Sequence, residues 1–167
     1  MAKTLHKFAM FCIVNLVQKY MLRKKKRRPS LKSIEHYASV IFQVLRTGMQ
    51  WNELKEDCHY TTYHKKFVEW SNAGIFSLAH KITAKHARVN GLITDEDLNT
   101  LSIDTSMIKN NRGVEEIGPN HYDRFRNATK VSVVVSQRGI PLGLSFRGAN
   151  VHDIKMVFDT IDDVQIK

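Results

Sequence analysis

Apolar residues in the first ninety positions recur with helical spacing. An apolar run at residues 8–17 lies inside a segment, residues 4–22, that the pattern predicts as the first helix. A second helix is predicted after Pro29, which disfavours a helical residue before it, with Ser30 as its N-cap and Gly48 just past its end. Its inward face is predicted from residues with helical spacing, namely Ile34, Tyr37, Ile41, Val44 and Leu45.

Two more helices are predicted before residue 90. The third covers about residues 61–72, and its apolar stripe consists of Tyr63, Phe67 and Trp70. Four polar residues share its turns but leave that stripe: Thr62, His64, Lys65 and Lys66. Gly74 is predicted to close this helix. Residues 75–89 are predicted to form the fourth helix, with an inward stripe of Ile75, Leu78 and Ile82.

The pattern changes near residue 99, where short β-branched runs replace helical spacing. Strands are predicted at residues 100–108, 129–136 and 140–148. Residues 137–141 are predicted to connect the last two as a hairpin, and the polar stretch 109–128 as a long loop. A final helix is predicted from a stripe of Ile154, Val157, Phe158 and Ile161. The order predicts an α+β protein with a helical domain at residues 1–92 and a second domain at residues 99–167.

Composition adds a strong charge imbalance to this picture. The 167 residues include 26 Lys and Arg against 16 Asp and Glu, which gives a net charge of +10. This excess favours a polyanionic partner, most simply nucleic acid, although a membrane surface also suits basic charge. The apolar run at residues 8–17 has the length of a signal-peptide core, but no small-residue cleavage site follows it, and it is too short to span a bilayer, which takes about 20 residues. We therefore expect a buried helix and no membrane partner, and a secretory or membrane signal is the alternative. Cys12 and Cys58 show no metal-binding spacing and are predicted to be reduced intracellular thiols.

A carboxylate interrupts the first predicted strand. Asp104 lies between Ile103 and the pair Met107–Ile108 in the stretch NTLSIDTSMIKNN. Burying a carboxylate costs several kcal/mol unless it is paired, hydrogen-bonded or bound to a metal. From spacing alone, Asp104 is therefore either an edge-strand carboxylate that faces water or a metal ligand.

Basic residues gather at two places that nucleic acid could reach. Six of them stand in a row at residues 23–28: Arg23, Lys24, Lys25, Lys26, Arg27 and Arg28. This run suits a solvated linker, a nuclear import signal or a linker that contacts the DNA backbone, and such contacts would be salt-dependent and blind to sequence. The polar residues of the helix at 61–72 form either a DNA-contacting face or an ordinary solvated one.

Three positions near the predicted strands allow two interpretations each. Lys130 and Arg147 either approach a phosphate backbone or are simply exposed. His152–Asp153 could suggest a metal site, but we expect one of these two residues to cap the final helix.

Several motifs occur together in an order that resembles a known family. They are VLRTGMQWNEL (44–54), YTTYHKKFVEWSNAGIF (60–76), SIDTSMI (102–108), GPNHYDR (118–124), TKVSVVVSQRGIPL (129–142) and GANVHD (148–153). The chain resembles, over about residues 15–165, the bacterial insertion-sequence transposases that carry a small helical domain ahead of a DDE catalytic domain of ribonuclease H-like fold. The resemblance implies a helix-turn-helix-like N-terminal domain, followed by an incomplete ribonuclease H-like β-β-β-α unit.

The resemblance also implies a role for Asp104. In that family the central strand of a mixed sheet carries the first of three catalytic carboxylates, and Asp104 is the matching residue. Such carboxylates hold Mg²⁺ ions that activate the attacking oxygen and stabilise the leaving one in phosphoryl transfer. The implied partner is DNA at the ends of the mobile element. The matching location is the cytoplasm or nucleoid of a bacterium, or the nucleus if the host is a eukaryote or a virus.

The second catalytic Asp and the Glu have no counterpart before Lys167. Asp162 and Asp163 fall on or after the final helix, not on a strand. We therefore expect that these residues alone do not cut or join DNA, that Mg²⁺ binds only in a completed domain, and that the sheet has an open edge and an uncovered face. Either a complementary C-terminal polypeptide completes the domain or the chain is a decayed remnant, and self-association into a homo-oligomer stays open.

Two other classes of protein stay open beside an incomplete transposase. One is a non-catalytic DNA-binding regulator derived from a transposase. The other is a basic protein that binds RNA or acidic lipid.

Overall fold

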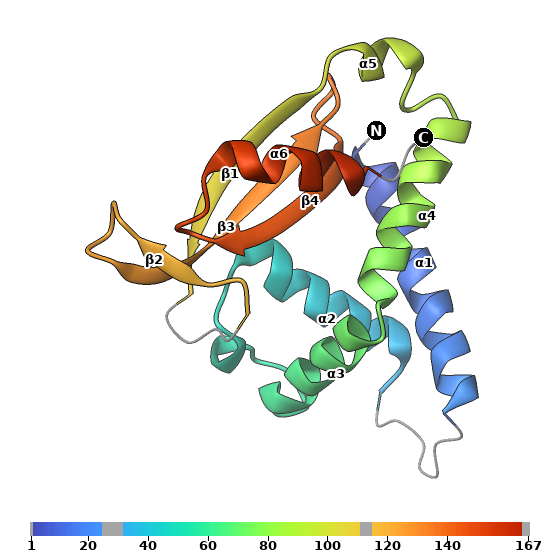
Figure 1. The fold of residues 1–167 in the computed structure, drawn as a ribbon. Coiled ribbons are helices and arrows are strands. Elements are labelled where there is room, and N and C mark those ends of the chain that lie inside the picture. The colour runs from blue at the N-terminus through green and yellow to red at the C-terminus, as the bar shows by residue number, and fades with distance from the viewer. Residues whose placement is uncertain (1, 25–31, 111–114, 165–167) are drawn as a thin grey trace. The chain divides into compact units, whose positions relative to one another are not determined.

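The computed structural model describes residues 2–24, 32–110 and 115–164 (Figure 1). The chain divides into two compact units, Met1–Thr83 and Ala84–Lys167. The order of helices followed by strands confirms the predicted α+β class.

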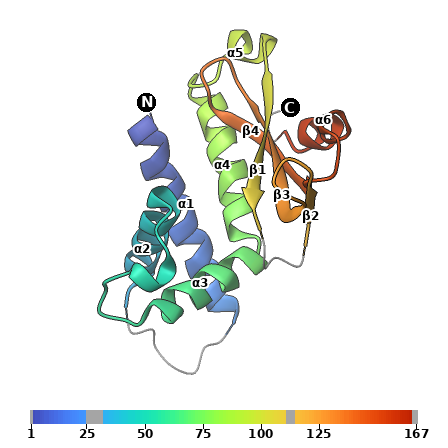
Figure 2. The same cartoon turned by 90° about the vertical axis from the view of Figure 1, so that its left-hand side faces the viewer.

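The first unit is helical (Figure 2). It contains α1 (Ala2–Arg23), α2 (Ile34–Thr47), the short 3-10 helix η1 (Trp51–Glu53), α3 (Tyr60–Asn72) and the first part of α4 (Ile75–Val89). Its core is made of buried residues from the four α-helices: Cys12, Ile13, Val17, Tyr37, Ala38, Val40, Ile41, Tyr63, Trp70, Ile75 and Ala79. The four predicted helices of this unit are thus confirmed, with ends shifted by no more than a few residues.

Of the two predicted ends of α2, the N-cap is a different serine and the C-terminal glycine is confirmed. Ser33, not Ser30, caps the helix, because its side chain accepts a hydrogen bond from the backbone N–H of His36. Ser30 itself lies outside the described residues. At the other end Gly48 adopts a left-handed φ of 68° and donates its N–H to the carbonyl of Val44, as its position predicted.

The predicted inward face is buried on α3 but partly exposed on α4. Tyr63 and Trp70 are fully buried, which confirms the stripe of α3. On α4, however, Leu78 and Ile82 are 46% and 37% exposed, so the predicted stripe is wrong for these two residues. The buried positions of α4 besides Ile75 are alanines: Ala79, Ala84 and Ala87.

The second unit contains the only sheet among the described residues. Its elements are the end of α4, α5 (Asp95–Asn99), β1 (Ser102–Lys109), β2 (Gly118–Asn120), β3 (Arg126–Val135), β4 (Pro141–Gly148) and α6 (Asp153–Asp162). All strand pairs are antiparallel. Because β1 and β4 both pair with the same part of β3, β3 is central and β1 lies at an edge. The β3–β4 hairpin confirms the predicted connection at residues 137–141.

Two elements of this unit were missed. Part of the predicted loop at 109–128 is β2, which pairs with the start of β3. The short helix α5 begins with a capping box, in which Thr94 and Asp97 exchange hydrogen bonds. The carboxylate of Asp97 also binds Arg138 Nε at 2.8 Å, in the β3–β4 turn. This ion pair attaches α5 to the β3–β4 turn within the second unit.

Helix α6 lies across the sheet against β3 and β4 (Figure 1). Four polar residues bind across this contact, which we name the β3–α6 seam: Lys130 and Ser132 on β3, Asp153 and Thr160 on α6. The Thr160 hydroxyl lies 2.8 Å from Ser132 Oγ, and it also lies 2.7 Å from Ser145 Oγ on β4. The seam turns the face with Met156 and Thr160 inward.

The predicted stripe of α6 is therefore wrong. Ile154, Phe158 and Ile161 are 69%, 73% and 44% exposed, and they form the outer face of the helix. The physical reason is that buried hydroxyl and charged groups of the sheet need hydrogen-bond partners, which Thr160 and Asp153 supply and apolar side chains do not.

The closest approach between α6 and the sheet occurs at Gly143 of β4. A Cβ added there would lie 2.8 Å from the Thr160 carbonyl oxygen and 2.9 Å from the Val164 nitrogen, both backbone atoms. We expect Gly143→Ala to destabilise the second unit by about 1–3 kcal/mol, because the helix must move away. Hydrogen exchange of the β3 amides measures this loss in the second unit specifically. The exposed control Gln137→Ala should leave the exchange unchanged, and equal rates in both variants would contradict the close packing.

Candidate nucleic-acid interface

Asp104 lies midway along β1, opposite Val133 of β3. It is exposed, and its Oδ1 accepts a 2.8 Å hydrogen bond from the backbone N–H of Thr105. Among the described residues the sheet is antiparallel and β1 is an edge strand, which is the open edge expected of an incomplete domain. The central strand of a mixed sheet that the resemblance implied belongs to a completed domain and stays a prediction. Exposure at an edge explains how the carboxylate is tolerated without a partner charge.

A magnesium site needs more than this carboxylate. No group of three or more His, Cys, Asp or Glu residues that could hold a metal ion occurs in the part of the chain that the structure describes. Mg²⁺ takes near-octahedral oxygen coordination, and one monodentate carboxylate leaves it held mainly by water. Asp104 alone therefore does not fit a Mg²⁺ site.

The described part of the basic run lies at the end of α1. Arg23 is exposed in the last turn, where a positive charge favours the helix dipole. Lys24 donates to Glu69 Oε1 at 3.2 Å and lies over the Tyr20 ring, and hydrogen bonds to Tyr20 and Glu69 raise the pKa of its ammonium. Four residues of the run lie outside the described residues: Lys25, Lys26, Arg27 and Arg28.

The four polar residues of α3 do not form one uniform face. His64 and Lys65 are exposed, and the His64 ring meets the Trp51 ring edge-on at 5.3 Å. Thr62 is half-buried. Lys66 is 17% exposed, because it binds Glu69 at 3.5 Å and lies 5.8 Å from the centre of the Tyr37 ring. Of the four, His64 and Lys65 are the most open to a ligand.

Lys130 differs from both interpretations of the sequence, since each assumed an exposed side chain. The side chain is 8% exposed, and its ammonium donates to the Val151 carbonyl and to Asp153 Oδ1, each at 2.6 Å. The bond from Lys130 holds the pKa of the Asp153 carboxyl below its usual range. His152 caps α6 by accepting from the N–H of Ile154, as expected. Lys130 therefore serves the β3–α6 seam.

Arg147 is also committed to carboxylates of its own unit. Its guanidinium binds Glu116 at 3.1 Å and Asp159 at 2.8 Å. The side chain stays 43% exposed, so these pairs are screened by water.

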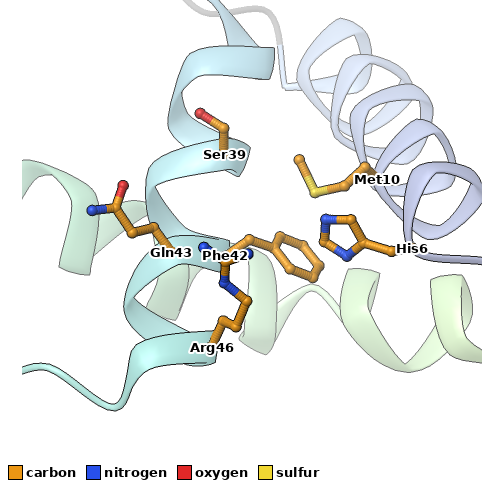
Figure 3. A pocket seen from close by; sticks show the side chains of 6 residues that line it. All are labelled: His6, Met10, Ser39, Phe42, Gln43 and Arg46. Carbon is orange, nitrogen blue, oxygen red and sulfur yellow. The ribbon is translucent and has the colours of Figure 1, made fainter. Parts of the chain in front are cut away.

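A hollow of about 230 Å³ lies between α1 and α2 in the first unit (Figure 3). His6 and Phe42 form its wall, with ring centroids 5.6 Å apart. Arg46 lies on its rim, and a guanidinium there suits phosphate or carboxylate oxygens. No sequence pattern indicates this hollow, because its two sides come from two different helices, α1 and α2.

Sequence reasoning also missed the turn between β2 and β3, residues 121–125. Tyr122 is 92% exposed and Phe125 is 65% exposed. Arg124 is exposed between them, and Arg126 is exposed where β3 begins. The signal for this site was present in the alternation of aromatic and basic residues in NHYDRFRN. We did not identify the site because the stretch 109–128 was predicted as one long loop.

Comparisons with protein-family models, with curated proteins and with solved structures found no match. Within the described residues, no helix is both long and apolar enough to cross a bilayer.

The Asp153 carboxyl gives the second unit a pH-dependent stability. Because its pKa in the folded state lies below the ordinary value of 3.8, its contribution is full above that value and is lost as the pH falls further. We expect Asp153→Asn to cost less than about 1 kcal/mol near neutral pH, because the half-exposed carboxylate is screened by water, and we expect this cost to shrink as the pH falls below 3.8 and the wild-type carboxyl takes up a proton. Hydrogen exchange of the β3 amides across this range measures the difference. The exposed control Asp162→Asn should track the wild type, and a pH-independent loss for Asp153→Asn would contradict the pairing.

Proposed function

We propose that this chain is a transposase-related DNA-binding protein and that its second unit is the first part of a ribonuclease H-like DDE domain. The observation that carries the proposal is the position of Asp104. It is an exposed carboxylate midway along the first long strand of an antiparallel β1–β3–β4 sheet, and α6 folds back over that sheet. This order matches what the resemblance implies, with β2 inserted before the second long strand.

Several features support DNA as the partner. The net charge of +10 favours a polyanion. Exposed basic residues occur on the first unit at Arg23, Lys65 and Arg46. The proposed ligand of this unit is duplex DNA at the ends of a mobile element.

Catalysis needs two carboxylates beyond these residues. We infer that they come from outside this sequence, either further along a longer chain or on a second polypeptide. Two surfaces are suited to receive such a segment: the free edge of β1 and the outer stripe of α6, where Ile154, Phe158 and Ile161 are exposed. A second copy of this chain is the competing occupant. Mg²⁺ would bind only after completion, since Asp104 alone does not fit it.

Complementation tests this incomplete-enzyme proposal. We expect the chain alone to leave a labelled element-end duplex intact. With a polypeptide that supplies the second Asp and the Glu, Mg²⁺-dependent strand cleavage should appear, measured on a denaturing gel. Asp104→Asn should abolish the restored cleavage by about 10³-fold or more, because it removes one ligand charge from the metal site.

The matched control is Asp162→Asn, an exposed carboxylate on α6. It should cleave like the wild type. Cleavage by the Asp104→Asn mixture at the wild-type rate would contradict the assigned role.

A non-catalytic DNA-binding regulator is the second candidate. It is favoured by the lack of a three-ligand metal group among the described residues. Such a protein would bind element ends with or without the second polypeptide, and mixing would never produce cleavage.

Duplex binding tests the DNA proposal shared by both candidates. We expect binding to a terminal inverted repeat to exceed binding to random duplex by on the order of 10³-fold. Lys65→Gln should weaken duplex binding roughly 3- to 10-fold, because one phosphate contact is lost. It should also reduce the slope of log affinity against log salt concentration by about one. Fluorescence anisotropy at several salt concentrations measures both quantities. Lys81→Gln, an exposed lysine of α4, is the control, and an equal loss in both variants would leave only general charge attraction.

A further inference from the structure

The turn between β2 and β3 presents two aromatic rings to solvent. The exposed fractions of Tyr122 and Phe125 are 92% and 65%. Large aromatic side chains normally bury most of their area, so two exposed rings at one turn form an unusual surface. The turn lies beyond the part of the sheet formed by β1, β3 and β4, at the outer end of the β2–β3 hairpin (Figure 1).

Hydrogen bonds within the turn fix its backbone. The Asn120 carbonyl accepts from the N–H groups of Asp123 at 3.1 Å and Phe125 at 3.0 Å, and its side-chain oxygen accepts from Tyr122 at 3.0 Å. Arg124 and Phe125 have φ values of 50° and 58°. This left-handed region is unfavourable for bulky residues, yet Phe125 adopts it at an exposed position where packing does not demand it. These bonds hold the backbone that carries the two rings in one conformation.

Positive charge surrounds the two rings. Arg124 and Arg126 are exposed, and no described side chain forms an ion pair with either guanidinium. The carboxylate of Asp123 in the turn lies 3.9 Å from Lys109 Nζ on β1, and this ammonium offsets its negative charge. The His121 ring packs edge-on against Phe125, with centroids 4.9 Å apart.

We propose that this β2–β3 turn, residues 121–125, together with Arg126 at the start of β3, binds unpaired bases of single-stranded DNA. The bases stack on Tyr122 and Phe125, and the adjacent phosphates lie at Arg124 and Arg126. This inference rests on the proposed DNA-binding function and assigns the second unit its own ligand, an unpaired strand as distinct from a duplex.

The repeating unit of single-stranded DNA, the nucleotide, has a chemical partner for both the rings and the guanidinium groups of this surface. A nucleotide carries both a flat aromatic face, which stacks on a ring, and a phosphate charge, which pairs with a guanidinium. A protein partner would have to cover both rings and also supply carboxylates to two guanidinium groups. Stacking on aromatic rings tolerates any base, so we expect little sequence preference.

Fluorescence anisotropy with the full chain tests the proposal. The probes are a labelled oligothymidine of about 16 nucleotides and a blunt duplex of the same length. The double variant Tyr122→Ala with Phe125→Ala should bind the single strand roughly 10-fold or more weakly, while its duplex affinity changes less than about 2-fold. The conservative pair Tyr122→Phe with Phe125→Tyr should keep single-strand binding.

A control variant separates the turn from exposed apolar surface in general. Phe11→Ala removes a ring that is 64% exposed on α1, and it should leave both affinities unchanged. Tyr122→Trp provides a direct readout, because a base stacked on the new indole should quench its fluorescence when oligothymidine is added, beyond any change in the wild type.

The outcomes distinguish this proposal from the proposed function. If the wild type binds no duplex but binds the single strand through the two rings, the element-end function fails and the inference stands. Unchanged single-strand binding in the double variant overturns the inference, as does an equal loss on both probes. A loss of self-association or of vesicle binding in its place, seen by sedimentation, would assign the turn to another partner and overturn it too.

Discussion

The β3–α6 seam determines how the second unit is built. Lys130 and Ser132 are buried on the central strand, and buried polar groups need partners. Asp153 and Thr160 supply those partners, so helix α6 must lie with this polar face toward the sheet. Gly143 allows the backbone contact that such close packing requires. The orientation of α6, and with it the outward direction of its apolar stripe, follows from these few polar contacts.

The proposed function depends on what the seam leaves uncovered. With the polar side of α6 turned inward, Ile154 and Phe158 face outward, and β1 keeps one unpaired edge among the described residues. Such surfaces are costly for an isolated domain and useful for one that is completed by another segment. Asp104 on β1 and the aromatic turn before β3 then belong to the same sheet, so the proposed chemistry and strand binding share one rigid support.

Sequence patterns predicted elements better than they predicted faces. The five helices and three strands with clear spacing were identified, and so were the turn at Gly48 and the β3–β4 hairpin. The stripe of α6 was assigned to the wrong side because hydrophobic periodicity carries no information about a polar seam. Lys130 was expected at the surface because its partner Asp153 is distant in sequence. The elements β2 and α5 were missed because three or five residues are too few for periodicity to be seen.

The free edge of β1 also affects how the protein behaves at high concentration. An unpaired strand offers its N–H and C=O groups to any neighbouring chain, and this is a common route to aggregation. Ser102, Asp104 and Ser106 make one face of β1 hydrophilic, and Lys109 adds a charge at its end. Charged and polar edge residues oppose continuous strand pairing between copies. Asp104 therefore opposes strand pairing between copies of the chain whether or not the chain performs catalysis.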